Sequence, residues 1–297
     1  MICPCITTLF ADGILLLNID LHSHSNISDG TLPPAELVRR AASSGVEVLA
    51  LTDHDNIGGL DEARAEAQKL GVLFVNGVEV SVSWEKTTLH IVGLGIDPYN
   101  TELTAGLHSI RSGRHARAKL MAADLMRVGL PDILEGAYTY ANNRDMIGRA
   151  HFARYMAEQG LVTDTKSAFK KYLVKGKPGF VPHQWATLSD TVNWIVGAGG
   201  IAVVAHPGRY DISGAAMRRL LTEFKSLGGR AIEVVTSNHT KDQAGQYGAL
   251  AKEFELAASR GSDYHGPGES YTEPGRLPNL PTDLTAVWDA HPIIHFK

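Results

Sequence analysis

Histidine and carboxylate side chains cluster in one short segment near the N-terminus, which reads IDLHSHSNISDG over residues 19–30. His22 and His24 are two residues apart, and Asp29 follows five residues later. In an extended chain, residues i and i+2 point to the same face, so both imidazoles could reach one target. Imidazole nitrogens and carboxylate oxygens bind divalent transition metals, so this segment predicts one part of a metal site.

Five further segments carry the same residue types at the ends of apolar runs. They read LALTDHDN, NGVEVS, TLHIVGLG, AVVAHPGRY and SRGSDYHG, and they contain His54, Glu79, His90, His206, Asp263 and His265. Each motif alone has a simpler interpretation, since an aspartate can cap a helix and a histidine before a proline can belong to a turn. Together, six buried histidines and three buried carboxylates without a cation would leave costly unpaired groups.

The donor set indicates the kind and number of ions. It contains no thiolate, because Cys3 and Cys5 both lie in the first five residues. Imidazole and carboxylate suit manganese, our first choice, and also iron or zinc. Nine donors exceed what one tetrahedral site needs, so we expect two or three ions, with Asp29, Glu79 or Asp263 bridging neighbouring ions.

Donors so far apart in sequence require a fold that collects them. Apolar β-branched runs predict strands at residues 14–22, 46–54, 72–80, 89–96, 201–206, 231–237 and 255–265. Helical patterns occupy residues 34–44, 59–70, 187–196, 215–227 and 241–254. Buried parallel strands that alternate with helices indicate an α/β barrel or a doubly wound sheet, and the C-terminal ends of barrel strands meet on one face.

Residues 101–179 break this alternation, because they contain helical patterns and no convincing strand. We predict a barrel formed by residues 18–100 and 180–297, with residues 101–179 as a helical insertion that contributes to substrate binding. The proline-rich segment after Gly266 predicts an irregular cover over the surface. Residues 1–17 lack the basic start of a signal peptide, so we expect an extension ahead of the first strand.

Composition excludes several classes of protein. A length of 297 residues suits one large α/β domain with an insertion. The net charge of −4 argues against extensive binding of duplex nucleic acid. No apolar run approaches the roughly 18 residues of a membrane span. Two cysteines form no disulfide framework, which favours a cytoplasmic location.

The six segments, in this order, resemble the PHP (polymerase and histidinol phosphatase) family of metal-dependent phosphoesterases from about residue 18 onward. The resemblance implies a distorted seven-stranded α/β barrel. It also implies a trinuclear site formed by His22, His24, Asp29, His54, Glu79, His90, His206, Asp263 and His265. The phrases GRAHFARYM, KGKPGFVPHQWATL and AHPGRYDIS are similar to a bacterial branch of the family. Enzymes of that branch convert 3′,5′-nucleotide bisphosphates to 5′-mononucleotides and degrade short oligoribonucleotides from the 5′ end.

Basic residues near the metal motifs are candidates for phosphate binding. Arg209 lies three residues after His206, and its planar guanidinium could hold the transferred phosphate. A salt bridge at the strand end is the alternative. His239 follows the sixth predicted strand and could orient the phosphate or protonate the leaving oxygen, unless it is a surface histidine. Asp29 is expected to face substrate as well as metal.

The insertion offers a second set of cations. Arg111, Arg114 and Arg117 recur every three residues along one helical face, and Arg149 opens a further helix together with His151. We expect Arg114, Arg117 and Arg149 to hold a second, non-reacting phosphate; a solvated basic face is the alternative. Weaker candidates for substrate contacts are Lys175, Lys177 and His183, and Trp185 could stack on a base or pack in the core.

Three other functions share parts of this pattern. A phosphatase for a non-nucleotide substrate such as histidinol phosphate would use the same metal donors without needing the arginines of the insertion. A metal-dependent amide hydrolase would often carry a metal-bridging lysine, which no predicted strand end supplies. A module that binds nucleic acid without catalysis would be expected to have lost donors, and all nine are present.

Overall fold

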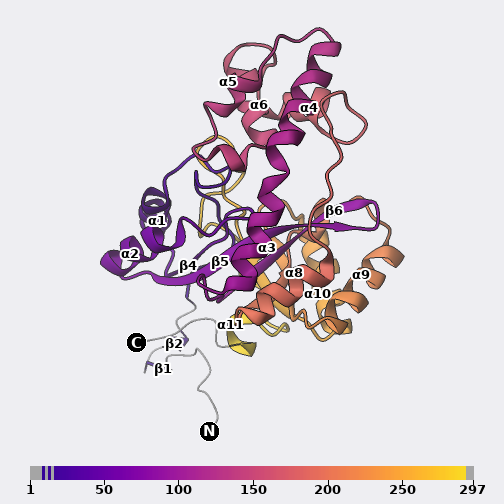
Figure 1. The fold of residues 1–297 in the computed structure, drawn as a ribbon. Helices are drawn as coiled ribbons and strands as arrows, with labels where there is room; N and C mark the ends of the chain where they lie inside the picture. The colour runs from indigo at the N-terminus through magenta and orange to yellow at the C-terminus, as the bar shows by residue number, and fades with distance from the viewer. Residues whose placement is uncertain (1–8, 11–12, 15–16, 292–297) are drawn as a thin grey trace.

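Seven strands form a nearly closed barrel at the centre of the protein, as the resemblance implied. The computed structural model describes residues 9–10, 13–14 and 17–291 (Figure 1). The strands are β3 (Ile19–Asp20), β4 (Val48–Leu51), β5 (Leu73–Trp84), β6 (Thr87–Leu94), β7 (Ile201–Val204), β8 (Ala231–Thr236) and β9 (Ala257–Gly261), and they pair in that order. The barrel closes where the Leu21 N–H donates to the Arg260 carbonyl at 3.1 Å.

Strand directions depart from the uniform parallel alternation that we expected. The pairs β5–β6 and β6–β7 are antiparallel, whereas the other neighbours are parallel. The reason is the short turn at Glu85 and Lys86, which joins β5 directly to β6 and leaves no room for a crossover helix. Because β6 runs in the opposite direction, its first half lies at the barrel end where the parallel strands finish. His90 therefore reaches the same mouth as residues that follow parallel strands.

Most regular strands are shorter than predicted. In place of a strand over residues 14–22, only Ile19–Asp20 is paired in the barrel, and Gly13–Ile14 (β2) pairs with Leu9–Phe10 (β1) in a separate sheet. Residues 15–16 lie outside the described part of the chain, as do residues 1–8 of the predicted extension. The last strand ends at Gly261 instead of His265. Seven of the nine donor residues consequently lie in loops beyond the paired segments, whereas Glu79 and His90 lie within β5 and β6.

Helices cover the outside of the barrel and supply its apolar packing. They are α1 (Pro34–Ser43), α2 (Leu60–Leu70), α3 (Thr101–Ser112), α8 (Leu188–Gly197), α9 (Gly214–Ser226), α10 (Lys241–Glu253) and α11 (Val287–Ala290). Leu37, Val38 and Ala41 of α1 are fully buried, at the spacing of one helical face. After β9 the chain is mainly turns up to α11, as expected for a surface cover. Within the described residues, no helix is both long and apolar enough to cross a membrane.

The insertion forms a lobe above the barrel mouth (Figure 1). It contains α4 (Arg114–Arg127), α5 (Leu134–Tyr138), α6 (Arg149–Glu158), α7 (Thr165–Ala168), a 3₁₀ turn at Arg144–Met146 and a π-helical turn at Phe169–Leu173. Leu125, Phe152 and Met156 are central to its own apolar core. By contrast, α3 packs on α8, and its Leu103 and Leu107 belong to the barrel core. The independent part of the insertion thus begins near residue 114 rather than at residue 101.

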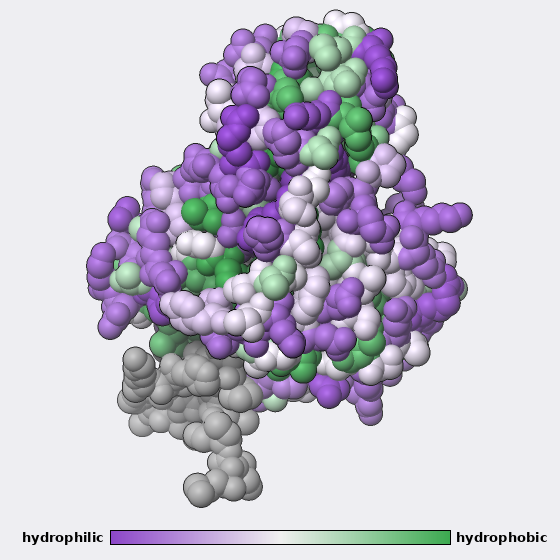
Figure 2. All heavy atoms as spheres, viewed as in Figure 1, coloured by the Kyte–Doolittle hydropathy of each residue, from purple (hydrophilic) through white to green (hydrophobic). Residues whose placement is uncertain are grey.

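The visible face of both lobes is mainly hydrophilic (Figure 2). Apolar side chains appear there only in small groups between polar ones. This distribution agrees with two internal cores, one in the barrel and one in the insertion.

Candidate metal centre

All nine predicted donor side chains converge at the mouth of the barrel. Three overlapping groups have donor atoms within 4.8 Å of one another: His24, Asp29, His54 and His265; His22, His24, Glu79 and Asp263; and His54, Glu79 and His90. His206 joins them, because its Nε2 lies 2.8 Å from Glu79 Oε1. The convergence of these residues was expected from the sequence, and their binding of metal stays a prediction.

Glu79 lies at the centre of the cluster and is fully buried. Its Oε1 is 2.9 Å from His90 Nδ1, and its Oε2 is 2.9 Å from His54 Nδ1. The same Oε2 is 3.3 Å from His24 Nε2. A single carboxylate that is adjacent to this many imidazoles has the position expected of a ligand shared between ions.

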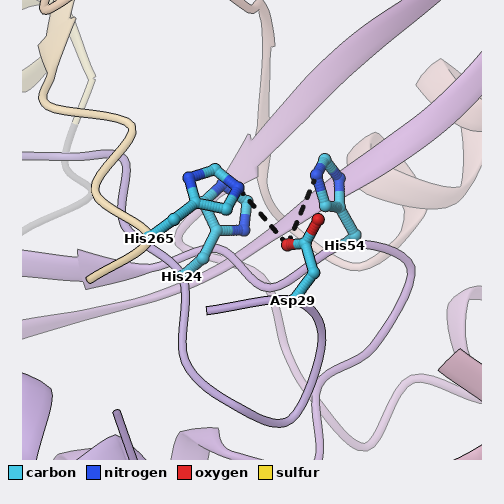
Figure 3. Close-up of side chains that lie close together, drawn as sticks. All are labelled: His24, Asp29, His54 and His265. Carbon is cyan, nitrogen blue, oxygen red and sulfur yellow. Dashed lines mark ion pairs between the residues drawn. The ribbon is translucent and has the colours of Figure 1, made fainter. Parts of the chain in front are cut away.

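Asp29 organises the outer side of the cluster (Figure 3). Its Oδ1 lies 3.3 Å from His265 Nε2 and 3.8 Å from His54 Nε2. The rings of His24 and His265 stack with centroids 4.2 Å apart, so both imidazoles enter the site from the same side. Asp29 also lines the cavity described below, which agrees with its expected position between metal and substrate.

The unpaired polar atoms of this cluster fit a group of cations. Asp29 Oδ1, Glu79 Oε2 and Asp263 Oδ1 are buried and accept no hydrogen bond. The Nε2 atoms of His22 and His24 are 3.0 Å apart. Buried carboxylate oxygens without partners are costly, and divalent ions between the donors would satisfy them.

The protonation states of His24 and Glu79 suit metal binding directly. Burial, with His265 nearby, lowers the pKa of His24 to about 3, so its imidazole is neutral. Burial alone would raise the pKa of Glu79, but His90 and His54 hold it well below its usual range. Neutral imidazole and ionised carboxylate are the forms in which these groups coordinate metals. Burial alone would lower the pKa of His54, but Glu79 and Asp29 raise it to about 9, so His54 would have to lose a proton when a cation binds.

Two carboxylates that sequence analysis missed hold the donors in place. Glu233 accepts a hydrogen bond from His22 Nδ1 at 2.7 Å and another from the His206 N–H at 2.5 Å. Asp53 accepts hydrogen bonds from Ser25 and Ser28, which fixes the loop that leads to Asp29. Such outer partners orient the ligands of a metal. The signal for Glu233 was its position inside an otherwise apolar strand, AIEVVT.

Backbone strain occurs where the chain turns donors into the site. His206 has φ of +25°, Asp263 has +53° and Asp55 has +47°. Positive φ is unfavourable for residues other than glycine and persists where surrounding structure enforces it, frequently at functional sites. Two of these three residues are predicted donors, and the third contacts an arginine of the substrate cavity.

A cavity of about 730 Å³ extends from the donor cluster into the insertion. Its walls include the predicted substrate residues Asp29, Arg114, Arg117, Arg149, Lys175, His183 and Arg209. Lys177 does not line it. Trp185 also borders the cavity while packing against the barrel core, so both of its expected roles remain compatible with the fold.

The arginines of the insertion form a concentrated positive charge inside the cavity. The guanidinium groups of Arg114 and Arg117 lie 4.8 Å and 5.3 Å from the Trp185 ring centre. Arg114 forms an ion pair with Asp55, whereas Arg117 and Arg149 donate only to backbone carbonyls among the described residues. Burial, with Arg149 and Arg114 close by, lowers the pKa of Arg117 to about 9. An anionic ligand would relieve this repulsion.

Other basic residues of the predicted set have different positions. Arg111 is engaged by the Asp55 carbonyl at 2.6 Å. The buried His151 accepts a hydrogen bond at Nδ1 from the Gly148 N–H at 3.0 Å, so its Nε2 carries the proton. This Nε2 has no hydrogen-bond partner and the ring lines the cavity, which leaves it able to donate to a bound ligand.

Arg209 lies beside the donor cluster, and the ring of His239 is held by two backbone groups. Arg209 donates to Asp263 Oδ2 at 2.6 Å, and 47% of its side chain is exposed, so it can also reach a ligand. His239 donates from Nδ1 to the Val234 carbonyl at 2.9 Å and accepts at Nε2 from the Gly208 N–H at 3.0 Å. With both ring nitrogens engaged, His239 holds the turn that carries Arg209, and its expected contact with substrate stays a prediction.

Arg154 is a further residue that sequence analysis missed. It extends from α6, donates to both carboxylate oxygens of Glu269 at 2.5 Å and 2.6 Å, and also donates to the Asp29 carbonyl. Glu269 lies in the loop that follows His265. One buried guanidinium therefore joins the insertion to the two loops that carry Asp29 and His265.

Replacing Arg154 with alanine is expected to lower the affinity of the predicted metal site. Without Arg154, Glu269 loses its partner and the Asp29 loop is no longer held in place. Breaking a buried ion pair in this way should lower the free energy of unfolding by about 3 kcal/mol or more. Metal content after dialysis and the melting temperature would measure the effect. The Arg154→Lys variant keeps the charge and should recover part of both quantities. Unchanged metal retention in the alanine variant would exclude this coupling.

Comparisons with known proteins agree with this geometry. The sequence pattern of the PHP domain family matches residues 20–202. A 3′,5′-nucleoside bisphosphate phosphatase from Chromobacterium violaceum is 50% identical over 273 residues, which cover 92% of this chain and 96% of that protein. A 5′-3′ exoribonuclease from Haemophilus influenzae is 42% identical over 270 residues, 91% of this chain and 97% of that protein.

A solved structure has the same fold. It is described as an amidohydrolase from Chromobacterium violaceum with bound sulfate and no metal. It superposes with a TM-score of 0.90 at 49% identity and covers 94% of this chain and 97% of that chain. The barrel and the inserted lobe are therefore shared along nearly the whole length of both chains.

Proposed function

The chain belongs to the PHP domain family, and we propose that it is a metal-dependent phosphoesterase that hydrolyses the 3′-phosphate of 3′,5′-nucleoside bisphosphates. The products are the 5′-mononucleotide and inorganic phosphate. The observation that carries this proposal is one cavity with two different ends. One end is lined by Asp29, His54 and His90 of the donor cluster, and the other by Arg114, Arg117 and Arg149. A substrate with two phosphates matches both.

The residues at the first end prepare the reacting phosphate. Divalent ions held by the nine donors would polarise the phosphoryl oxygens and lower the pKa of a water molecule, which is the usual contribution of metals to phosphoester hydrolysis. Arg209, fixed in direction by Asp263, donates its remaining N–H groups to the phosphoryl oxygens. His239 keeps Arg209 in position through the Gly208 backbone. Water adds to phosphorus as the P–O3′ bond breaks.

The residues at the second end bind the phosphate that does not react. Arg117 and Arg149 have guanidinium groups free of carboxylate partners among the described residues, and a phosphate would supply the missing charge. His151 adds a neutral donor at Nε2. Binding energy from this remote phosphate orients the reacting one, so it acts on turnover as well as on affinity.

The ion and its number belong to the same proposal. We favour manganese because the donor set is oxygen and nitrogen without sulfur, and three ions because there are three donor groups, which overlap at His24, His54 and Glu79. We also propose a cytoplasmic location, where nucleotide substrates of this kind would be encountered.

A second activity, 5′-to-3′ hydrolysis of short oligoribonucleotides, has its own support. The cavity continues beyond the arginines to Glu85 and Lys86 at the β5–β6 turn, so it has room beyond one small phosphate ester. The Haemophilus influenzae relative carries the name of such an enzyme. A phosphatase for histidinol phosphate would leave the arginine group without a role. An amide hydrolase is disfavoured because a metal-bridging lysine would be buried beside the donors, and no lysine is buried in the described part of the chain.

A phosphate-release screen with manganese would test the proposed function. The substrates are 3′-AMP, 5′-AMP, adenosine 3′,5′-bisphosphate and a short 5′-phosphorylated RNA. We expect kcat/KM for the bisphosphate to exceed that for 3′-AMP by about 10- to 100-fold, since charge-assisted hydrogen bonds contribute about 1.5–3 kcal/mol. 5′-AMP should release no phosphate. Equal rates for 3′-AMP and the bisphosphate would contradict the proposal.

A further inference from the structure

The segment from Thr165 to Lys177 borders the substrate cavity through Phe169 and Lys175. At its start, Lys166 Nζ lies 4.2 Å from the centre of the Tyr271 ring, in the loop that follows β9. Near its end, Lys175 Nζ donates to the Lys86 carbonyl at 3.4 Å, in the β5–β6 turn. Lys175 also lines the cavity. The segment therefore connects the loop after β9 with the β5–β6 turn and borders the cavity along the way.

This segment carries a dense and unneutralised positive charge. It contains five exposed lysines, which we call the lysine track: Lys166, Lys170, Lys171, Lys175 and Lys177. No Asp or Glu occurs from residue 165 to residue 189. Among the described residues, none of the five forms an ion pair, whereas three of the six other lysines, Lys69, Lys225 and Lys252, do. The charge contrasts with the net charge of −4 of the whole chain.

An exposed aromatic side chain accompanies the lysines. Tyr271 is 68% exposed and stands beside the first lysine of the track; among the described large apolar side chains, only Tyr99, at 72%, is more exposed. Proteins that bind single-stranded nucleic acids combine a positive path for the backbone with aromatic rings on which bases stack. A solvated lysine face would need neither the exposed ring nor continuity with a phosphate-binding cavity.

We propose that the lysine track binds the phosphates of a single-stranded oligoribonucleotide whose 5′ end occupies the cavity, with Tyr271 as a stacking surface. This inference rests on the proposed phosphoesterase function and extends it to the part of a substrate that remains outside the cavity. A mononucleotide bisphosphate would end inside the cavity and would not reach the track. Substrate length and salt concentration should therefore act together: salt should weaken the hydrolysis of oligonucleotides more than that of the bisphosphate.

The test removes charge from the track without touching the cavity. The triple variant Lys166→Gln/Lys170→Gln/Lys171→Gln leaves Lys175 and Lys177 unchanged. We expect its kcat/KM for a 5′-phosphorylated pentaribonucleotide to fall on the order of tenfold at low salt. The slope of log kcat/KM against log salt should become shallower by about 2, since each phosphate contact on a single strand contributes about 0.7. Its kcat/KM for adenosine 3′,5′-bisphosphate should not change.

A matched variant separates a local effect from one of net charge. Lys69→Gln/Lys119→Gln/Lys252→Gln removes the same charge from exposed lysines that do not line the cavity. It should leave kcat/KM for both substrates and the salt slope unchanged. The inference would be overturned if kcat/KM for the pentaribonucleotide fell equally in the two triple variants, or if it did not fall in the track variant.

A binding measurement keeps this inference separate from the catalytic proposal. Fluorescence anisotropy with a 3′-labelled, 5′-phosphorylated pentaribonucleotide and metal-free protein should show weaker binding by the track variant. Tyr271→Ala should weaken binding about tenfold, and Tyr271→Phe should retain it. If wild-type protein binds RNA as described but fails to hydrolyse the bisphosphate with manganese, only the proposed function falls. If the protein hydrolyses the bisphosphate but does not bind RNA, only the proposed role of the lysine track is refuted.

Discussion

Replacing Asp263 with asparagine is expected to abolish hydrolysis of every phosphate ester and to lower the bound metal. Asp263 Oδ1 lies 3.2 Å from His24 Nε2 and 3.5 Å from His22 Nε2, and Oδ2 holds Arg209. Asparagine keeps the size of the side chain but removes the negative charge that Asp263 contributes to the group formed with His22, His24 and Glu79. It also frees Arg209, so positioning of the phosphate is lost together with the metal.

The expected loss in kcat is at least about 10³-fold, because metals contribute several kcal/mol to such reactions and about 1.4 kcal/mol equals a factor of ten. Steady-state kinetics with an aryl phosphate and with the bisphosphate, together with elemental analysis of the purified protein, would measure it. His54→Ala should act in the same direction. Asp211→Asn is the matched control, because Asp211 lines the cavity but belongs to none of the donor groups. Full metal content and activity in Asp263→Asn would refute the assigned centre.

Arg149→Ala should distinguish between substrates instead of removing all activity. Arg149 lies at the first residue of α6, lines the cavity and donates only to the Leu173 carbonyl among the described residues. Losing its charge-assisted contacts, worth about 1.5–3 kcal/mol, should lower kcat/KM for a 3′,5′-bisphosphate by about 10- to 100-fold. An aryl phosphate has no second phosphate, so its kcat/KM should change by less than about twofold on the same physical argument.

Two further variants sharpen the result for Arg149. Arg149→Lys keeps the positive charge without the planar fork, and should fall between wild type and alanine. Arg127→Ala removes an exposed arginine that pairs with Asp124 outside the cavity. It should leave kcat/KM for both substrates unchanged. Equal losses for the bisphosphate and the aryl phosphate in Arg149→Ala would show that Arg149 acts on the metal centre or on folding.

Much of the metal site could be predicted because its donors are marked in the chain. Apolar runs that end in His54 or in Asp263 leave little choice about where the polar groups must meet, since parallel strands finish at one barrel end. His90 lies in the donor cluster although its strand runs antiparallel, because the first half of such a strand lies at the same mouth. Seven strands were expected and found, with the donors mostly beyond the paired residues.

Hydrogen-bond partners were less accessible to prediction. His239 was expected to act on substrate, yet its two nitrogens are engaged by Val234 and Gly208. The same sequence would allow either role, because an imidazole next to a strand end gives no indication of what its ring nitrogens contact. Arg154 and Glu233 were missed for the converse reason: their partners lie on elements distant in sequence.

The sequence by itself determined the residue types of the centre and the barrel that collects them, because the periodic burial of apolar side chains and the chemistry of imidazole and carboxylate are local properties. Only the tertiary structure decided which cations remain free for a ligand. Arg111 and Arg114 are adjacent to Asp55, whereas Arg149 has no carboxylate partner among the described residues. Whether a charged side chain is neutralised depends on what the fold brings within a few ångströms of it, and that distance is set by packing between segments far apart in the chain.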